Sequence, residues 1–294
     1  MNRRQFIQTA ALATAATATL KLTAEGVSGV HWPIGCFNRP WKDIKCDFDT
    51  TLAGTKEAGY KITGLLTASG PDSFVRSNST PEYLEALKKK IAAAGLRASM
   101  ASMGVKESAP EADAIKDVRQ QIDNTKFLDI EFLLTFGVER PQNYENYYAV
   151  MRDAAAYAQE RGVKLVMKPH GGGSGAAEEI MRCLDKVKHP NFKIWYDAGN
   201  IIYYTGKDPL EQLKPIAQYV TGFCAKDCDR QKGNVWLEFG KGKVDFHTVF
   251  RELKRAGFNG PVMVECCEHG KTAAEMTANA AKNRVFLEKV FAEI

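Results

Sequence analysis

Short apolar runs alternate with longer amphipathic stretches along the chain from about residue 30 onward. The runs are rich in β-branched and aromatic residues, which favours strands, whereas apolar positions between them recur with the period of a helix. Alternation of this kind predicts βαβ units built around a parallel sheet. The eight predicted strands cover residues 30–37, 60–67, 96–103, 130–137, 163–170, 192–199, 220–227 and 261–268.

Start and stop signals define the helices between these runs. The segment 79–95 has Ser79 and Thr80 before Pro81 in its first turn, and it ends at Gly95. Polar caps, an early proline and a terminal glycine are the expected punctuation of a helix. Similar signals predict helices over residues 143–162 and 208–220, and the flanks of the last strand predict helices over 244–258 and 272–291.

Eight βα units favour a closed barrel over an open sheet. An open doubly wound sheet is expected to carry a glycine-rich fingerprint at its first βα turn. None follows the run IGCF at residues 34–37. A length of 294 residues suits one barrel, since α/β barrels commonly exceed ~200 residues as a single domain. We therefore predict an α/β fold, a single-domain (β/α)8 TIM barrel over residues 26–294.

Composition and charge narrow the range of partners. Hydrophobic residues make up 45% of the chain and charged residues 26%, as in ordinary globular enzymes. The net charge is +5, with Lys and Arg spread along the chain, so no nucleic-acid partner is expected. The seven cysteines lack a CxxC pair, which gives no support to a structural zinc site. Their oxidation state and the oligomeric state stay open.

The first residues have a composition of their own. Arg3 and Arg4 are followed by Phe6 and by an Ala/Thr-rich run that ends near Leu22. This pattern resembles a twin-arginine export signal, to which residues 1–25 are assigned, with a short amphipathic helix or remnant anchor as the alternative. The run falls short of the ~20 consistently apolar residues of a membrane span. We therefore expect an exported, periplasmic protein without stable membrane insertion.

Polar residues stand at the carboxyl ends of several predicted strands. In barrels of this type the chemistry lies at that end, so these positions outweigh polar residues elsewhere. Lys168 and His170, for example, finish the otherwise apolar run KLVMKPH. The candidates found in this way are Asn38, Arg39, Lys168, His170, Asp197, Asn200, Cys224, Lys226, Asp227 and Glu265.

Four stretches resemble the xylose-isomerase-like barrels, a family of sugar isomerases and epimerases, inosose dehydratases and a branch of apurinic endonucleases. They are GVKLVMKPH (162–170), WYDAGN (195–200), GFCAKDCD (222–229) and FGKGKVDFHTVFRELKRAGFNGPVMVE (239–265). The resemblance implies one divalent metal held by a glutamate, an aspartate, a histidine and a second glutamate on strands five to eight. Asp197 and Glu265 match two of these positions, whereas Lys168 and Cys224 replace the other two ligands.

Two arrangements of this altered site remain open. In one, no metal is bound, and the Lys168 ammonium supplies the positive charge that two buried carboxylates require. With a neutral Cys224, the four side chains then carry a net charge of −1. In the other, His170, Asp197 and Glu265 hold one divalent metal (Mn, Mg or Zn), because residues two apart on a strand share a face. An inert, ion-paired Lys168 and a merely apolar Cys224 are the plainer interpretations.

The resemblance implies proton abstraction next to a carbonyl, with Glu265 as the proton-transfer carboxylate and Asp197 as its orienter. Lys168 or a metal would stabilise the enediolate. If burial lowers the pKa of Lys168, this lysine could be the base instead. His170 is the remaining catalytic candidate, as a proton relay. The substrate-binding candidates are Lys226, Asn200, Arg39 and Trp41.

The expected partner is a small-molecule carbohydrate, and export favours an unphosphorylated saccharide or keto sugar. A sugar isomerase or epimerase-like enzyme is the first interpretation. The alternatives are a keto-glycoside lyase or dehydratase that works by β-elimination, and a non-catalytic carbohydrate-binding barrel with a decayed metal site. The endonuclease branch is disfavoured, because the five histidines at these positions do not supply ligands for several metals.

Overall fold

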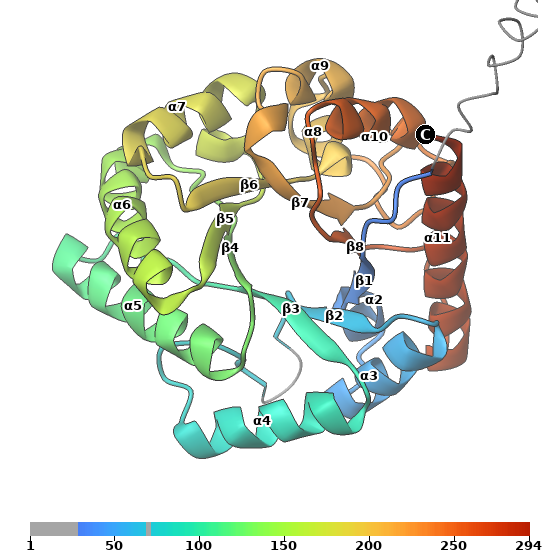
Figure 1. Cartoon of the computed structure of the whole chain (residues 1–294), viewed down its shortest axis with the longest axis horizontal. Helices are drawn as coiled ribbons and strands as arrows, with labels where there is room; N and C mark the ends of the chain where they lie inside the picture. The colour runs from blue at the N-terminus through green and yellow to red at the C-terminus, as the bar shows by residue number, and fades with distance from the viewer. Residues whose placement is uncertain (1–28, 69–71) are drawn as a thin grey trace, which may run out of the picture.

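The computed structural model describes residues 29–68 and 72–294. Eight parallel strands form a closed barrel in sequence order, and a ring of helices surrounds it (Figure 1). The predicted single-domain (β/α)8 barrel is therefore confirmed. The predicted export signal, residues 1–25, lies outside the described residues. No helix among the described residues has the length and apolar character needed to cross a membrane.

Each predicted strand contains one observed strand. Neighbouring strands pair in parallel all the way round, and β1 closes the ring on β8 through Ile34 opposite Val262. The strands are β1 (Ile34–Phe37), β2 (Ile62–Leu65), β3 (Arg97–Ser102), β4 (Phe132–Thr135), β5 (Lys164–Met167), β6 (Phe192–Tyr196), β7 (Val220–Ala225) and β8 (Val262–Val264).

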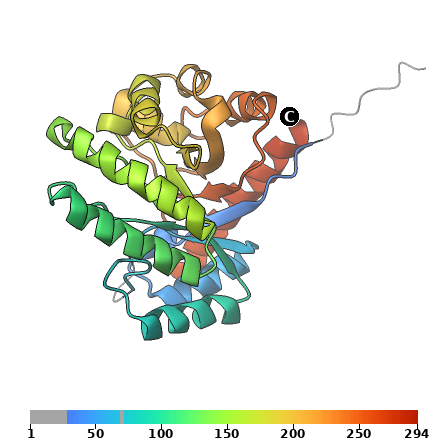
Figure 2. The same ribbon diagram turned by 60° about the vertical axis from the view of Figure 1, so that its left-hand side comes forward.

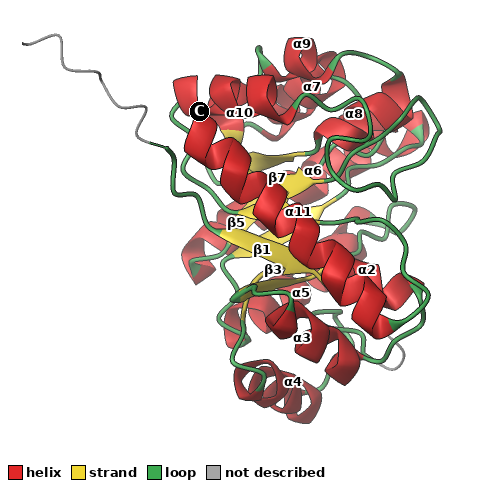
Figure 3. Ribbon diagram, turned by 90° about the vertical axis from the view of Figure 1, so that its right-hand side faces the viewer, coloured by secondary structure: helices red, strands yellow, loops and turns green. Residues whose placement is uncertain are grey.

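The helices cover the outer face of the barrel. Helices α5 and α6 lie side by side in both views (Figures 1 and 2), and α11 runs along the outside of β1 (Figure 3). Their bounds are α2 (Arg39–Asp43), α3 (Phe48–Glu57), α4 (Pro81–Ala93), α5 (Glu111–Phe127), α6 (Tyr144–Arg161), α7 (Ala177–Val187), α8 (Ala198–Thr205), α9 (Pro209–Leu213), α10 (Phe246–Arg255) and α11 (Ala273–Glu293), with single 3-10 turns at Pro141–Asn143, Gly172–Ser174 and Ala217–Tyr219.

Capping explains most of the helix boundaries, and one predicted helix is wrong. Thr80 accepts a hydrogen bond from the Tyr83 amide at the start of α4, as its capping role requires. The helix predicted over residues 208–220 ends at Leu213 instead. Pro215 is the cause, because a proline removes a helical hydrogen bond and disfavours helical geometry in the residue before it.

The barrel interior forms a packed core of its own beneath the loops. Gly222 on β7 allows the Trp195 ring to approach, since a Cβ there would lie 2.2 Å from that ring. This layer supports the ends of the strands from below. The side chains of this interior cluster are Phe37, Leu66, Met100, Phe132, Leu134, Val166, Trp195, Cys224 and Met263.

Candidate active site

Four charged residues each directly follow one of the last four strands: Lys168 follows β5, Asp197 follows β6, Lys226 lies one residue beyond the end of β7, and Glu265 follows β8. Because the strands are parallel and the barrel is closed, their carboxyl ends meet, and the four side chains converge as predicted. Their exposed fractions are only 1%, 0%, 3% and 1%. We call these four residues the charge cluster.

The sheet ladder continues into the charge cluster and fixes its backbone. The Lys168 amide donates to the carbonyl of Thr135 at 2.9 Å, and the Glu265 amide donates to the carbonyl of Ala225 at 2.8 Å. The backbone of Lys168 and Glu265 is therefore held by the same kind of hydrogen bonds as the strands, and this fixes the origin of both side chains.

Each lysine of the charge cluster contacts both carboxylates. Lys168 Nζ forms a hydrogen-bonded ion pair with Glu265 Oε2 and lies 3.1 Å from Asp197 Oδ2. Lys226 Nζ lies 2.9 Å from Glu265 Oε1 and 3.3 Å from Asp197 Oδ2. Arg39, at the start of α2, adds a third cation through Nη1 to Glu265 Oε1. The two carboxylates are thus held apart by ammonium groups.

The ionisation of the charge cluster follows from these contacts. Burial opposes the charge on Glu265, yet Lys168, Lys226 and Arg39 hold the pKa of this carboxyl well below its usual range. Burial likewise disfavours the Lys168 ammonium, but Glu265 and Asp197 raise its pKa above the usual value. Lys168 therefore stays protonated, which argues against the alternative in which it acts as the base. Burial raises the pKa of Asp197, against the effect of both lysines.

The structure corrects the predicted charge balance. Counting Lys168 alone against Asp197 and Glu265 gave a net charge of −1, but Lys226 and Arg39 also contact the carboxylates. Three cations face two carboxylates, so the net charge is +1. Cys224 does not alter this balance, because burial inside the barrel raises the pKa of its thiol well above the usual value.

The structure does not assemble His170, Asp197 and Glu265, the alternative predicted metal site, as a set of ligands. Among the described residues, no three His, Cys, Asp or Glu side chains come together in a way that could hold a metal ion. Two ammonium groups and a guanidinium contact the carboxylate oxygens that would bind it. A divalent cation among these groups would face three positive charges, so the residues present do not fit one.

His170 faces a different neighbour. Its ring nitrogens lie 2.9 and 3.2 Å from the hydroxyl of Tyr204, and the ring of Phe136 meets it edge to face. Burial, together with nearby Lys168 and Lys226, lowers the pKa of His170 to about 4. The imidazole is therefore neutral near neutral pH.

The glycine-rich segment after His170 is folded against the neighbouring loop. Ser174 Oγ accepts from the His170 amide at 3.1 Å and donates to the Phe136 carbonyl at 2.8 Å. At Gly172, φ is +49° and a Cβ would lie 2.4 Å from the Cα of Glu139, so only glycine fits there. The segment fixes the position of His170.

Asn200 and Asp227 have positioning contacts. The Asp197 carboxylate caps α8 by accepting from the Asn200 amide at 2.8 Å, and the Asn200 side chain donates to the Pro169 carbonyl at 2.6 Å. Asn200 thereby joins the loops after β5 and β6 beneath a cavity that it also lines. The Asp227 carboxylate accepts from backbone amides at Cys228, Gly240, Gly242 and Val244, and so organises the long loop after β7.

Two neighbouring cavities open above the charge cluster, and they share Arg39 and His170. The larger has a volume of about 550 Å³ and the smaller about 300 Å³. Sequence reasoning missed several of their side chains, because these lie in loops without a periodic pattern. The larger cavity is lined by Arg39, Lys42, Asp43, Lys45, Leu66, Thr67, Phe136, Lys168, His170 and Glu265, and the smaller by Arg39, His170, Asn200, Tyr203, Tyr204, Lys226, Gly233, Asn234, Val235 and Trp236.

Trp41 does not lie at these cavities, contrary to its predicted role in binding substrate. It is 0% exposed, and its indole nitrogen donates to Thr277 Oγ1 at 3.1 Å. Residues two apart on a helix point about 200° apart, so α2 directs Arg39 to the site and Trp41 into the core. Trp236 supplies an aromatic face instead: Arg39 lies 5.2 Å from its ring, and His269 stacks on it at 4.2 Å.

Comparison with known proteins agrees with this fold. The family model for the xylose isomerase-like TIM barrel matches residues 52–289. L-ribulose-5-phosphate 3-epimerase UlaE from Escherichia coli (strain K12) is 23% identical over 269 residues, which cover 86% of this chain and 92% of that enzyme. Inosose dehydratase from Clostridium perfringens is 26% identical over 151 residues, which cover 46% of this chain and only 50% of the dehydratase.

Two solved structures share the architecture at low identity. A xylose isomerase-like TIM barrel protein from Mycobacterium smegmatis, in complex with magnesium, has a TM-score of 0.73 and 17% identity, covering 90% of this chain and 98% of its own. D-psicose 3-epimerase with D-tagatose from Clostridium cellulolyticum H10 has a TM-score of 0.70 and 14% identity, covering 88% and 99%. The matched family model extends over most of the barrel, and the chain is a member of the xylose isomerase-like TIM barrel family.

Proposed function

We propose that the chain is a sugar isomerase or epimerase-like enzyme that removes a proton next to the carbonyl of an unphosphorylated keto sugar. One observation carries the proposal: two buried lysines each bridge the same two carboxylates at the carboxyl end of the barrel. Similarity to a sugar epimerase over most of the chain supports the reaction class. The paired arginines near the amino terminus support export, and with it a substrate that lacks phosphate.

In the proposed reaction, Glu265 takes the C–H proton. Of the two carboxylates that contact Lys168, only Glu265 lines the larger cavity. The electron pair of the broken C–H bond moves to the carbonyl oxygen and forms an enediolate. Returning the proton to the former carbonyl carbon, while a proton moves from the neighbouring hydroxyl to the former carbonyl oxygen, gives isomerisation. Adding a proton from water to the opposite face of the original carbon gives epimerisation. Asp197 orients the two ammonium groups.

Lys168 and Lys226 stabilise the developing oxyanion in this scheme. A preorganised cation in a water-poor site stabilises a developing oxyanion strongly, and losing one such donor typically costs about 10²–10³-fold in rate. The transfer of the proton to Glu265 leaves the net charge at +1, because this carboxylate loses the negative charge that the substrate gains. Lys168, Lys226 and Arg39 then face Asp197 and the new oxyanion. The lysines thus take the electrostatic role that a metal would supply in a family member that holds one.

β-Elimination is the second candidate, favoured by the similarity to inosose dehydratase. It shares the first step, after which the enediolate expels a hydroxyl or glycosyl group from the next carbon. That leaving group must be protonated as it departs. Tyr204 and His170 form a hydrogen-bonded pair on the wall of the smaller cavity, where they can relay such a proton.

Proton exchange tests the proposal most directly. The mature protein is incubated in D₂O with D-fructose, D-tagatose or D-psicose, and loss of the proton next to the carbonyl is followed by NMR, with and without a chelator. We expect exchange that survives chelation and that falls about 10²–10³-fold in Lys168→Met. Lys164→Met is the matched control, because Lys164 lies at the exposed start of β5, the strand that Lys168 follows, and pairs with Glu131.

Two results would contradict the proposal. Exchange that disappears on chelation and returns with a stoichiometric divalent ion would reject the lysine-for-metal mechanism. Sugar binding without exchange or elimination in the unmodified protein would instead support the non-catalytic carbohydrate-binding barrel.

A further inference from the structure

Two lysines without an ion pair stand at the rim of the larger cavity. Lys42 lies in the last turn of α2, and Lys45 lies two residues beyond the end of this helix. Both line the cavity together with Lys168 and Glu265. Within the part of the chain that the structure describes, neither ammonium group forms an ion pair. Asp43, which lies between them in sequence, is engaged elsewhere, with His269 Nε2 2.6 Å from its carboxylate. The rim therefore presents positive charge that no acidic side chain neutralises.

The charges of the whole region show how much negative charge it can accept. Five cations, namely Arg39, Lys42, Lys45, Lys168 and Lys226, face three carboxylates, namely Asp43, Asp197 and Glu265. The net charge is +2. Proton transfer from the substrate to Glu265 does not change this sum, because the enediolate gains the negative charge that Glu265 loses. The positive charge at the rim therefore remains uncompensated throughout the proposed reaction.

The backbone at Lys45 points to a role for its side chain. Its φ is +63°, in the left-handed region that favours glycine. The Lys45 amide donates to the Lys42 carbonyl at 2.9 Å and the Cys46 amide donates to the Trp41 carbonyl at 3.0 Å. These bonds form a Schellman motif, in which this position is usually glycine. A lysine there is conformationally costly, and strain of this kind is often retained at functional sites.

We propose that the rim of the larger cavity binds a carboxylate of the substrate through Lys42 and Lys45, so that the substrate class is a keto sugar acid. This inference rests on the proposed function for the placement of the reacting carbonyl at Lys168. A substrate carboxylate would lower the net charge of the region from +2 to +1. A phosphate, with a charge of about −1.5 to −2, would also match the charge of the region, so the preference for a carboxylate follows from the unphosphorylated substrate of the proposed function.

Binding measurements test this inference without relying on turnover. D-fructuronate, D-fructose and D-fructose 6-phosphate share one ketose backbone and differ in charge, and their dissociation constants are measured by titration calorimetry. We expect D-fructuronate to bind more tightly than D-fructose. Lys42→Gln and Lys45→Gly should each weaken D-fructuronate binding by up to about fivefold, the range for an exposed charge pair, and leave D-fructose binding unchanged. Added salt should reduce the difference.

Lys45→Gly separates recognition from folding. Glycine relieves the left-handed backbone, so we expect a higher melting temperature together with weaker binding of D-fructuronate. Lys116→Gln on α5 is the control, since it removes an equal charge from an exposed lysine outside the cavity.

Three outcomes would overturn the inference: equal affinity for D-fructuronate and D-fructose, D-fructuronate affinity unchanged in both rim variants, or tighter lysine-dependent binding of D-fructose 6-phosphate. If D-fructuronate binding depends on the two lysines but no proton exchange occurs, the anion site is supported. In that case only the proposed function is rejected.

Discussion

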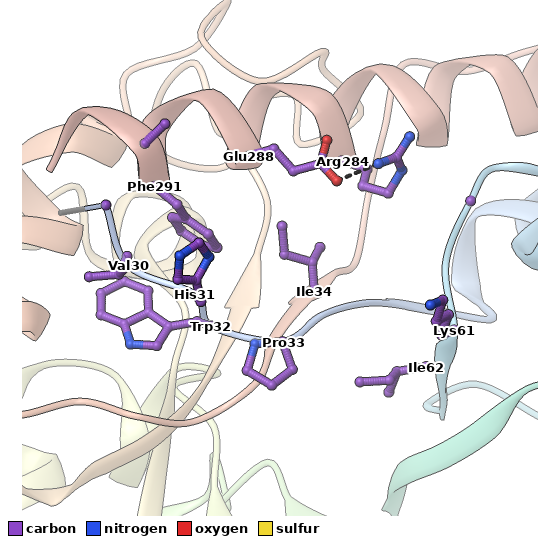
Figure 4. Close-up of a pocket in the computed structure, with 13 residues that line it drawn as sticks. Val30, His31, Trp32, Pro33, Ile34, Lys61, Ile62, Arg284, Glu288 and Phe291 are labelled. Carbon is purple, nitrogen blue, oxygen red and sulfur yellow. Dashed lines mark hydrogen bonds and ion pairs between the residues drawn. The ribbon is translucent and has the colours of Figure 1, made fainter.

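The two ends of the barrel both carry cavities, and they differ in charge far more than in size. The cavity at the amino ends of β1 and β2 has a volume of about 630 Å³ and is lined largely by apolar side chains such as Trp32, Ile34 and Phe291 (Figure 4). Its ion pair, Arg284 with Glu288, lies at the surface, with side chains 26% and 49% exposed. At the opposite end, the cavity that contains Lys168 and Glu265 has a volume of about 550 Å³, slightly less than that of the apolar cavity.

Burial of charge distinguishes the two ends. Lys168 and Glu265 are each 1% exposed and form one ion pair. An exposed pair adds little to stability, whereas a buried pair is costly to desolvate and is tolerated only with close partners. The comparison teaches that cavity volume does not mark the functional end of this barrel. A concentration of buried charged groups marks the functional end, because folding alone does not require such groups.

Glu265→Gln should cause the largest loss of stability, and so it tests the difference between the two ends most directly. It leaves Lys168, Lys226 and Arg39 facing Asp197 alone, so we expect a loss of about 3–5 kcal/mol in the free energy of unfolding, as for breaking a buried pair. Urea denaturation measures it. Lys168→Met should cost less, because the remaining two cations balance the two carboxylates.

The order of these two effects is the critical observation. Equal losses of unfolding free energy in Glu265→Gln and Lys168→Met would show that the net charge of +1 does not affect the stability of the folded state. Stability unchanged in both variants would contradict the buried charge cluster itself.

The charge cluster could be predicted from the sequence because it depends only on topology. Lys168, Asp197, Lys226 and Glu265 each follow an apolar strand, and parallel strands in a closed barrel bring such positions together whatever the loops do. The fold was predictable for the same reason, since the periods of strand and helix are repeated eight times. Local breaks were harder, as Pro215 shows by ending α9 early.

The rest of the site depends on tertiary geometry that no periodicity encodes. Trp41 and Arg39 differ by two positions on one short helix, yet one lies in the core and the other at the site. Trp236 lies in the loop after β7, which the Asp227 carboxylate holds by accepting from four backbone amides. His170 lies two residues after Lys168, so its side chain is expected to point the same way. The folded glycine segment instead turns this side chain toward Tyr204 and away from the carboxylates.

His170 gives an effect of intermediate size that depends on pH. Its folded pKa of about 4 lies below the usual 6.5, so between these values the unfolded chain binds a proton that the folded chain does not. Stability should therefore fall as the pH falls from 6.5 to about 4. Urea denaturation of His170→Asn should show a shallower dependence over this range.

His247→Asn is the matched control for that slope. The side chain of His247 is 37% exposed, close to the 36% of His170, but it is paired with Glu293 and lies outside both cavities. An equally reduced pH dependence of stability in His170→Asn and His247→Asn would show that this dependence does not arise from His170 at the site.

Arg284→Met combined with Glu288→Gln should have the smallest effect and tests the other side of the comparison. The two side chains form an i,i+4 pair on α11 above the cavity of Figure 4. Because both are partly exposed, we expect their coupling in a double-mutant cycle to be at most about 1 kcal/mol and to decrease with salt. Arg284 Nε also donates to the Ala58 carbonyl at 3.0 Å, so the single Arg284→Met change should cost more than Glu288→Gln. A coupling as large as that between Lys168 and Glu265 would mean that burial of charge does not distinguish the ends.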